Sequence, residues 1–412
     1  MMKQLGITAL LATLCLLFGA CAPAAEPTAV TTTTAATTTT TAPPIVKVER
    51  RAVWVSLYDL ADIFAPCKTL QQAQEAVDTM MDTVVAHKMN TVFFHVRAGS
   101  DAYYSSALFS PASAVKELLM QGFDPLHYAV EAAHKRGIEL HAWINPYRVG
   151  KNKDRIVGDA ATMKDDAGRY YYVPTAASAQ RLILDGVREV LDNYDVDGIQ
   201  YDDYFYPENF LKADTVYDFE KADYAAYQQA GGTLSVGDWR RAAVDALVAA
   251  THTLTKAADV TFGISPSHNV DKTYNGMYAD SKKWLAQSGY VDYVCPQIYV
   301  GFENETAAFA ETADTWANYP RDPSVDLYVG LALYKIGLKD DTWAGDVGRT
   351  EWQSRTDVMM RSVTYAREKG YDGLCFYSFS FLTPDTCIIA EFPTKNDKTV
   401  AKQELEHLLT VL

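Results

Sequence analysis

Strand-like runs alternate with long helical patterns along most of this 412-residue chain, and this alternation predicts an α/β fold, the (β/α)8 TIM barrel. The runs number eight, which is the count that closes such a barrel. No low-complexity segment interrupts residues 46–395, so we expect one barrel domain there. The strand-like runs are AVWVSLY (52–58), TVFFHVR (91–97), IELHAWI (138–144), DGIQYDD (197–203), VTFGISP (260–266), VDYVCPQIY (291–299), LYVGLALY (327–334) and DGLCFYSF (372–379).

Helical patterns fill the connections between these runs. Gly137 and Gly370 directly follow two of the patterns, at the place where glycine commonly ends a helix. After the barrel, residues 396–412 are predicted to form a C-terminal helix. The helical patterns cover residues 124–136, 176–194, 238–258, 306–318 and 351–369.

Residues 1–21 have the pattern of a lipoprotein signal peptide. One lysine precedes an apolar run that is too short to span a bilayer, and small residues precede Cys21. The sequence Phe18-Gly19-Ala20-Cys21 resembles a bacterial lipobox, in which the cysteine becomes lipidated, although Leu is usual at the position of Phe18. We therefore expect an extracytoplasmic protein that is anchored to the cell membrane as a lipoprotein through Cys21. Ordinary cleavage after Ala20 is the alternative.

Residues 22–45 consist almost entirely of Ala, Thr and Pro. Such a segment buries too little apolar surface to offset the entropy that ordering it would cost. We expect a disordered linker that joins the anchor to the barrel.

Composition narrows the classes of partner. The formal net charge is −15, from 37 basic and 52 acidic residues, which argues against nucleic acid and against a polybasic membrane surface. Membrane contact is therefore expected through the lipid alone, and the protein is expected to be a monomer. The sequence has no CxxC motif and no Cys/His cluster, so neither a metal nor another cofactor is expected. A disulfide between Cys67 and Cys387 is left open by their spacing.

The motif VDGIQYDDYFYP (196–207) carries the strongest functional signal. Gln200 and Asp202 share one face of the predicted strand, and that face should point into the barrel mouth, where barrel enzymes place their catalytic groups. The alternative is that Asp202 and Asp203 only cap the loop that follows. Asp203 would point to the opposite face unless the strand ends before it.

Eight segments spread over the whole barrel resemble the glycosyl-hydrolase-like family 10, which comprises bacterial envelope lipoproteins of the YngK type. The resemblance implies a hydrolase acting on cell-wall glycan, with strands of peptidoglycan as the expected substrate, but it does not supply a catalytic pair. At the position of Gln200 the family pattern more often has His. The matching segments are RAVWVSLYDL (51–60), TVFFHVRAGSDAYYSS (91–106), FDPLHYAVEAAHKRGIELHAWINPYRV (123–149), DGIQYDDYFYP (197–207), FGISPS (262–267), CPQIYVG (295–301), GLALYKIG (330–337) and GYDGLCFYSF (370–379).

Glycosidases generally use two carboxyl groups, one as acid and one as nucleophile or base. The spacing from Asp197 to Asp202 resembles fourth-strand motifs of other barrel glycosidases, in which the last Asp attacks the anomeric carbon. We predict that Asp202 is the nucleophile or electrostatic stabiliser. Asp203 and Glu303, which follows the sixth strand, are both candidates for the acid.

Other strand-end residues are predicted to bind the substrate. Arginine offers a rigid fork of donors, asparagine can both donate to and accept from a sugar hydroxyl, and aromatic rings can stack on sugars. His141 lies deep in the third strand and is predicted to be a hydrogen-bonded core histidine. The predicted substrate-binding residues are Arg97, Trp143, Asn145, Arg148, Gln200, Tyr204, Gln297 and Tyr299. For Trp143 the alternative is that it fills the barrel interior.

Two other functions compete with hydrolysis. A barrel with the same cleft but no turnover would be a glycan-binding envelope protein. A metal-dependent deacetylase could use His95, His141 and Asp202, but these residues are not at a compact ligand spacing.

Overall fold

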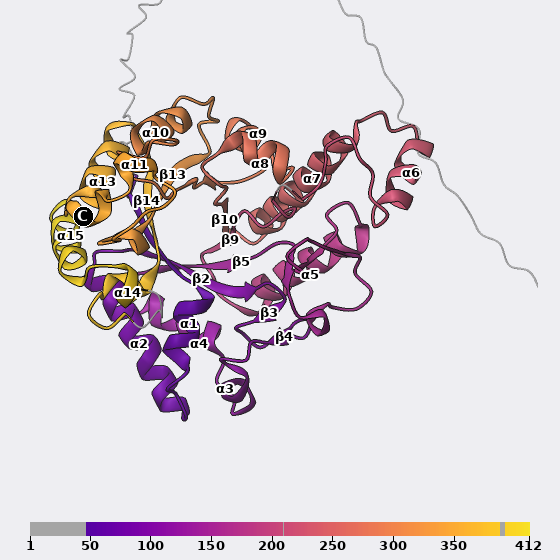
Figure 1. The fold of residues 1–412 in the computed structure, drawn as a ribbon. Helices are drawn as coiled ribbons and strands as arrows, with labels where there is room; N and C mark the ends of the chain where they lie inside the picture. The colour runs from indigo at the N-terminus through magenta and orange to yellow at the C-terminus, as the bar shows by residue number, and fades with distance from the viewer. Residues whose placement is uncertain (1–46, 209, 388–391) are drawn as a thin grey trace, which may run out of the picture. The chain divides into compact units, whose positions relative to one another are not determined.

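A computed structural model describes residues 47–208, 210–387 and 392–412. It confirms the predicted (β/α)8 barrel (Figure 1), because the first strand pairs with both the second and the last and so closes a ring of parallel strands. The signal peptide, Cys21 and the whole linker lie outside the described residues. The barrel strands are β1 (Arg50–Val55), β2 (Thr91–Ala98), β5 (Glu139–Ile144), β9 (Gly198–Tyr201), β10 (Thr261–Ile264), β11 (Tyr293–Val294) with β12 (Gln297–Ile298), β13 (Asp326–Leu331) and β14 (Gly373–Tyr377).

Helices surround this ring and cover its outer face (Figure 1). The larger ones are α1 (Leu57–Phe64), α2 (Leu70–Ala86), α4 (Pro125–His134), α5 (Ala177–Asn193), α6 (Lys221–Gln229), α7 (Val236–Ala257), α10 (Phe309–Ala317), α13 (Val358–Glu368) and α15 (Lys398–Val411). The shorter ones are α3 (Lys116–Met120), α8 (Val270–Gly276), α9 (Ser281–Ala286), α11 (Gly345–Gly348), α12 (Glu351–Ser354), α14 (Phe392–Lys395) and the 3-10 turns Lys153–Arg155, Leu333–Lys335 and Phe379–Leu382. No helix within the described ranges is both long enough and apolar enough to cross a membrane.

Short strands decorate two loops at the mouth. In the loop after β2, β3 (Asp101–Ala102) and β4 (Ser110–Pro111) extend the barrel sheet. In the loop after β5, a separate antiparallel sheet consists of β6 (Arg148–Gly150), β7 (Thr162–Lys164) and β8 (Tyr170–Tyr172).

Several predicted elements differ from the structure. The strand runs predicted over 52–58 and 327–334 end early, because Leu57 begins α1 and Leu333 begins a 3-10 turn. The sixth strand was expected to run unbroken over 291–299, but it consists of two short pieces, β11 and β12, separated by Cys295 and Pro296. Proline has no N–H for the strand ladder, which explains the interruption. One helix was expected over 351–369, but an extended Arg355, paired with Asp357, separates α12 from α13.

Side chains alternate between two cores, as the period of a strand requires. Val53 and Val55 of β1 pack outward in the core shared with the helices, whereas Ala52 and Trp54 point inward. The barrel interior is therefore filled by its own cluster, and its upper end forms the floor of the mouth. The interior cluster consists of Ala52, Trp54, Phe93, Trp143, Tyr293, Cys295, Tyr328 and Cys375.

The cysteines behave mostly as the sequence suggested. Cys295 and Cys375 are buried thiols inside the barrel. Cys67 keeps its thiol, whose Sγ lies 3.4 Å from the carbonyl oxygen of Ile63, so it is not bonded to Cys387.

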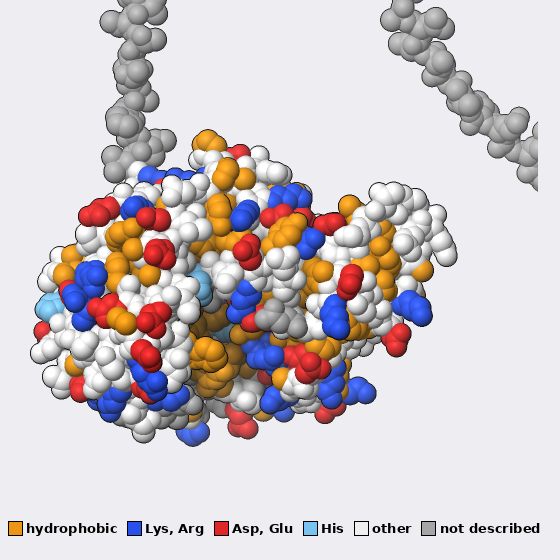
Figure 2. Space-filling view, turned by 45° about the horizontal axis from the view of Figure 1, so that its top comes forward, with side chains coloured by type: hydrophobic (Ala, Val, Ile, Leu, Met, Phe, Trp, Pro, Cys, Tyr) orange, Lys and Arg blue, Asp and Glu red, His pale blue; other side chains and the backbone are white. Residues whose placement is uncertain are grey.

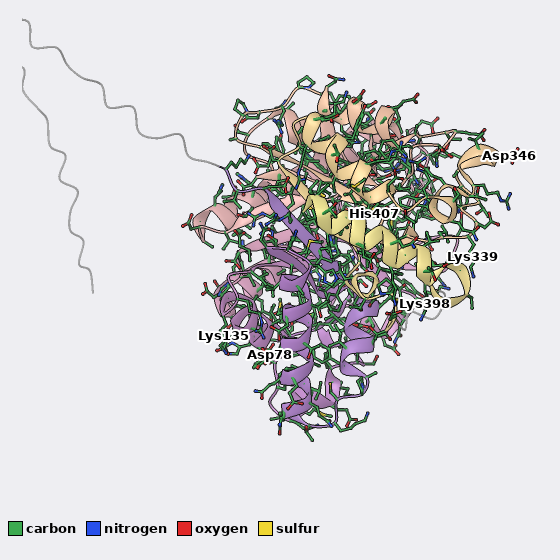
Figure 3. All side chains as sticks on the ribbon, turned by 90° about the vertical axis from the view of Figure 1, so that its left-hand side faces the viewer. Asp78, Lys135, Lys339, Asp346, Lys398 and His407 are labelled. Carbon is green, nitrogen blue, oxygen red and sulfur yellow. The ribbon has the colours of Figure 1, made fainter. Side chains whose placement is uncertain are left out.

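The C-terminal helix α15 packs along α13 at the outside of the barrel (Figure 1 and Figure 3). Its last carbonyl, that of Leu412, accepts a hydrogen bond from the Arg51 guanidinium at 2.9 Å. Asp397 caps its start by accepting from the backbone N–H groups of Thr399 and Val400. These contacts join the end of the chain to the first barrel strand.

Candidate active site

A cavity of about 230 Å³ opens at the carboxyl ends of the barrel strands. Figure 2 shows a hollow near the middle of the face that it draws, with hydrophobic side chains in its wall. The cavity combines two carboxyl groups with a mostly aromatic wall. Its lining consists of Trp54, Trp143, Asp202, Asp203, Tyr204, Ser265, Gln297, Tyr299, Tyr334 and Tyr377.

Asp202 is buried, and three groups donate hydrogen bonds to its carboxylate. Oδ2 accepts from the indole Nε1 of Trp143 at 2.8 Å and from the side-chain amide of Asn145, and Oδ1 accepts from the backbone N–H of Tyr204 at 3.2 Å. Burial, and then the neighbouring charge of Asp203, raises the pKa of Asp202 to about 7, although the three donors oppose this shift. The carboxyl group can therefore change its charge near neutral pH.

Asp203 reaches the same cavity because β9 ends at Tyr201, so the alternation of a regular strand no longer applies. Its side chain is half-buried. Burial raises the pKa of Asp203 to about 6, and the nearby Lys272 ammonium and Gln297 amide limit the rise. The sequence-based condition, that the strand must end before Asp203, is met.

Asn145 is held in place from its other side. Its Oδ1 accepts a hydrogen bond from the backbone N–H of Gly99 at 2.6 Å, while its amide contacts Asp202. Gly99 adopts a φ of +65°, and an added Cβ would lie 2.5 Å from the carbonyl oxygen of Val149, so only glycine fits. The predicted polar residue therefore acts on the carboxylate and does not itself line the cavity.

Three other predicted substrate-binding residues also lie outside the lining. Arg97 is buried on the outer face of β2, where its guanidinium donates to the carbonyls of Asn145 and Pro146 at 2.8 and 3.0 Å and lies over Phe109. The structure thus places Arg97 as a support for the turn after β5. Its side chain points outward because the strand register at Arg97 is irregular, a feature that strand periodicity does not reveal.

Arg148 and Gln200 support lining residues. The Arg148 guanidinium lies 4.5 Å from the centre of the Tyr204 ring, so it stacks on a cavity wall. Gln200 is fully buried, and its amide donates to the Ser265 hydroxyl at 2.6 Å and to the Tyr201 carbonyl at 2.7 Å.

The remaining predicted binding residues, Trp143, Tyr204, Gln297 and Tyr299, do line the cavity. Gln297 donates to the carbonyl of Ser265 at 2.8 Å. Tyr299 stacks on Tyr377, with ring centres 5.8 Å apart.

Glu303, the other candidate acid, is exposed and does not line the cavity. Its backbone N–H donates to the carboxylate of Glu351 at 3.0 Å, in a loop that also contacts Gly348. Strand order alone suggested that Glu303 lies across the mouth, but its loop turns toward α12. The carboxyl groups that line this cavity belong to Asp202 and Asp203.

Comparison with known proteins shows which family this barrel belongs to. Residues 49–345 match the family described as glycosyl hydrolase-like 10. The chain belongs to this family. It is 33% identical to glycosyl hydrolase YngK of Bacillus subtilis (strain 168) over 332 residues, which cover 72% of this chain and 63% of YngK, less than two thirds of that protein's length.

A second relative and a solved structure agree with this placement. Glycosyl hydrolase DigH of Escherichia coli (strain K12) is 30% identical over 355 residues, which cover 75% of this chain and 79% of DigH. The PgaB (BpsB) glycoside hydrolase domain of Bordetella bronchiseptica superimposes with a TM-score of 0.54 at 12% identity, over 82% of this chain and 97% of that domain. This last likeness shows the shared barrel fold.

In this member of the glycosyl hydrolase-like 10 family, four residues that line the cavity are not among the predicted site residues: Trp54, Ser265, Tyr334 and Tyr377. Tyr334 and Tyr377 lie at the carboxyl ends of the β13 and β14 segments and form part of the aromatic wall. Both stand at or near the end of a predicted strand run. The strand-end criterion finds them once it is extended from polar to aromatic side chains.

The two histidines considered as metal ligands take part in the packing of the barrel interior. His95 stacks on Trp143 with ring centres 3.6 Å apart, and burial lowers its pKa to about 3. His141 is hydrogen-bonded to the Tyr293 hydroxyl at 3.2 Å, which confirms the predicted core role. In the part of the chain that the structure describes, no three His, Cys, Asp or Glu side chains are grouped to hold a metal.

Proposed function

We propose that the protein is a glycoside hydrolase that cleaves O-glycosyl bonds in a cell-envelope glycan, with peptidoglycan strands as its substrate. The observation that carries the proposal is the pair Asp202 and Asp203, whose pKa values are raised toward neutrality in an aromatic-lined cavity at the barrel mouth. Membership of the glycosyl hydrolase-like 10 family supports it, as do relatives that carry the name glycosyl hydrolase.

In this proposal one carboxyl group acts as the acid and the other acts as the carboxylate that faces the anomeric carbon. Because they are neighbours in a shared site, their protons belong to the pair, and the raised pKa values of both groups let the pair hold a proton near neutral pH. In the free protein the pKa of Asp202 is raised further than that of Asp203, which favours Asp202 as the protonated group. We propose that the proton moves to Asp203 when substrate is bound, because three groups donate hydrogen bonds to Asp202 and favour its ionised form once positive charge develops on the sugar beside it.

In this assignment Asp203 donates its proton to the oxygen of the leaving sugar as the glycosidic bond breaks. The Asp202 carboxylate faces the positive charge that develops on the anomeric carbon, either as nucleophile or as electrostatic stabiliser. Trp143, Tyr204, Tyr299 and Tyr377 supply flat apolar surfaces against which a sugar ring can pack.

We also propose that the protein works outside the cytoplasm, anchored to the cell membrane. The sequence of residues 1–21 supports a lipid anchor at Cys21, and residues 22–45 supply a linker that would hold the barrel away from the membrane surface. A monomeric hydrolase tethered in this way can reach wall glycan outside the cytoplasm.

The test is to incubate residues 22–412 with purified peptidoglycan, both intact and stripped of its stem peptides, and to analyse the products by mass spectrometry. We expect products shortened at glycosidic bonds. Binding without any cleavage would favour the alternative, a non-catalytic glycan-binding envelope protein. Release of acetate without chain shortening would favour a deacetylase.

A further inference from the structure

A second and larger cavity, of about 760 Å³, lies beside the carboxylate cavity. It is formed by the loops that follow β1, β13 and β14, and we call it the outer cleft. Tyr334 and Tyr377 line both cavities, so the two are separated by no more than this shared wall. The outer cleft is lined by Tyr58, Tyr334, Lys339, Trp343, Tyr377 and Phe381, among others.

The outer cleft contains the most exposed aromatic side chains among the described residues. Trp343 is 85% exposed and Tyr58 is 60% exposed, and among the large hydrophobic side chains that are exposed in the described residues these are the two aromatic ones. Single exposed hydrophobic residues are common, but here both aromatic ones fall on the same cleft, next to the carboxyl pair. Flat exposed rings beside a catalytic cavity are suited to stacking on sugar rings.

An ion pair and several hydrogen bonds hold the loop that carries Trp343. Asp341 accepts from the Lys335 ammonium at 2.7 Å in a buried ion pair, and it also accepts from the backbone N–H of Trp343 at 3.4 Å. The Asn396 side chain donates to the carbonyls of Tyr334 and Ile336 and holds the base of the loop. Figure 3 shows Lys339 and Asp346, which flank Trp343 in the sequence, on the same outer edge of the barrel. A ring presented on an ordered loop binds without the entropic cost of arranging it.

The volumes of the two cavities also indicate that the outer cleft can hold part of the substrate. Sites for small ligands usually enclose about 300 to 1,000 Å³. The carboxylate cavity, at about 230 Å³, falls below that range, whereas the adjoining outer cleft, at about 760 Å³, lies within it. The carboxylate cavity has room for the reacting sugar. The remaining sugars of a glycan chain need further space, which the outer cleft offers.

We infer that the outer cleft binds the further pyranose units of the glycan chain that is cleaved, with Trp343 and Tyr58 as stacking surfaces. This inference rests on the proposed function. It makes the enzyme selective for long chains, because a short fragment placed at Asp202 and Asp203 leaves the outer cleft empty.

The test compares cleavage of peptidoglycan glycan strands separated by length, from disaccharide repeats to long strands, by residues 22–412 and by Trp343→Ala. For the unsubstituted protein we expect kcat/KM to rise with length. Trp343→Ala should lose about tenfold on long strands and almost nothing on the shortest cleaved fragment. Trp343→Phe should recover part of the loss because it keeps a flat ring.

Val347→Ala is the matched control, since Val347 is also exposed in the loop after β13 but does not line the outer cleft. It should behave as the unsubstituted protein on every length. Equal loss in Trp343→Ala and Val347→Ala, or an unchanged length dependence in Trp343→Ala, would overturn the inference.

A binding measurement separates this inference from the proposed function. Long strands are titrated by calorimetry into Asp202→Asn and into the double variant Asp202→Asn with Trp343→Ala. Binding that weakens about tenfold in the double variant supports the outer cleft even if the unsubstituted protein cleaves nothing, in which case the proposed hydrolysis fails alone. Equal binding by both variants overturns the outer cleft even if cleavage is found.

Discussion

Asp202 and Asp203 are consecutive residues with different surroundings. Asp202 is enclosed and accepts from Trp143, Asn145 and the backbone of Tyr204, whereas Asp203 is half-buried and faces the cavity beside Gln297. Burial raises the pKa of both groups, and the donors act mainly on Asp202. In one site, Asp202 can therefore act as the negatively charged carboxylate and Asp203 as the proton donor.

The acid assignment can be tested by two substitutions. Asp203→Asn should lower kcat by orders of magnitude on natural glycan and much less on activated aryl glycosides, whose leaving groups hardly need a proton. Glu303→Gln should leave both rates near normal because Glu303 does not line the cavity. The reverse pattern, measured in steady-state kinetics, would transfer the acid role to Glu303.

The raised pKa of Asp202 should also make the stability of the folded protein depend on pH. A carboxyl group whose pKa is higher in the folded state holds its proton more tightly there, so its contribution to stability is lost as pH rises from about 4 to about 7. At about pH 8 the buried charge costs stability, and Asp202→Asn removes that charge. The melting temperature of Asp202→Asn should therefore match or exceed that of the unsubstituted protein at about pH 8, and this advantage should shrink at about pH 4.

A clear drop in the melting temperature of Asp202→Asn at about pH 8 would contradict this account of Asp202. It would show that the carboxylate is a structural cap for the loop after β9, as the alternative sequence interpretation held.

At the scale of elements, the strands place the site because the barrel interior is tightly filled. An added Cβ on Gly263 of β10 would lie 2.1 Å from the Tyr293 ring, and one on Gly198 of β9 would lie 2.3 Å from the His141 ring. These glycines leave room for the rings of Tyr293 and His141, which pack beneath the floor of the cavity. The sequence offers no signal for this close packing beyond the glycine itself.

We predict that Gly263→Ala destabilises the protein by about 1 to 3 kcal/mol through overpacking, as measured by urea denaturation. Gly237→Ala, in the first turn of α7, is the control, because its Cβ would meet nothing closer than 3.4 Å. It should be neutral or slightly stabilising, since alanine favours helix more than glycine does. Equal destabilisation by both would argue against the packing explanation.

Hydrophobic periodicity and strand-end position predicted all eight barrel strands and the placement of Asp202, Trp143 and Gln297 at one cavity, whereas Asp203 reaches the cavity only because β9 ends at Tyr201. Both signals are local, and a parallel barrel brings the ends of its strands together automatically. Arg97 and Glu303 were misplaced because their positions depend on the irregular register of β2 and on a loop path, which no local pattern encodes.

On the scale of the whole molecule, the barrel and the N-terminal sequence serve different parts of the proposed function. In our proposal the barrel carries the site, and lipidation of Cys21 would hold that site at the membrane. Replacing Cys21 with Ala should move the protein from the membrane fraction into the soluble fraction or the medium, as followed by immunoblotting of fractionated cells. An unchanged membrane fraction would contradict lipid anchoring.

The most direct test of the central claim is the rate at which Asp202→Asn cleaves purified glycan strands, compared with the unsubstituted protein. The lost charge interaction is made chiefly in the transition state, so we predict a fall in kcat of several orders of magnitude with binding of the strands retained. Near-normal cleavage by Asp202→Asn would contradict the claim that this carboxylate carries the chemistry.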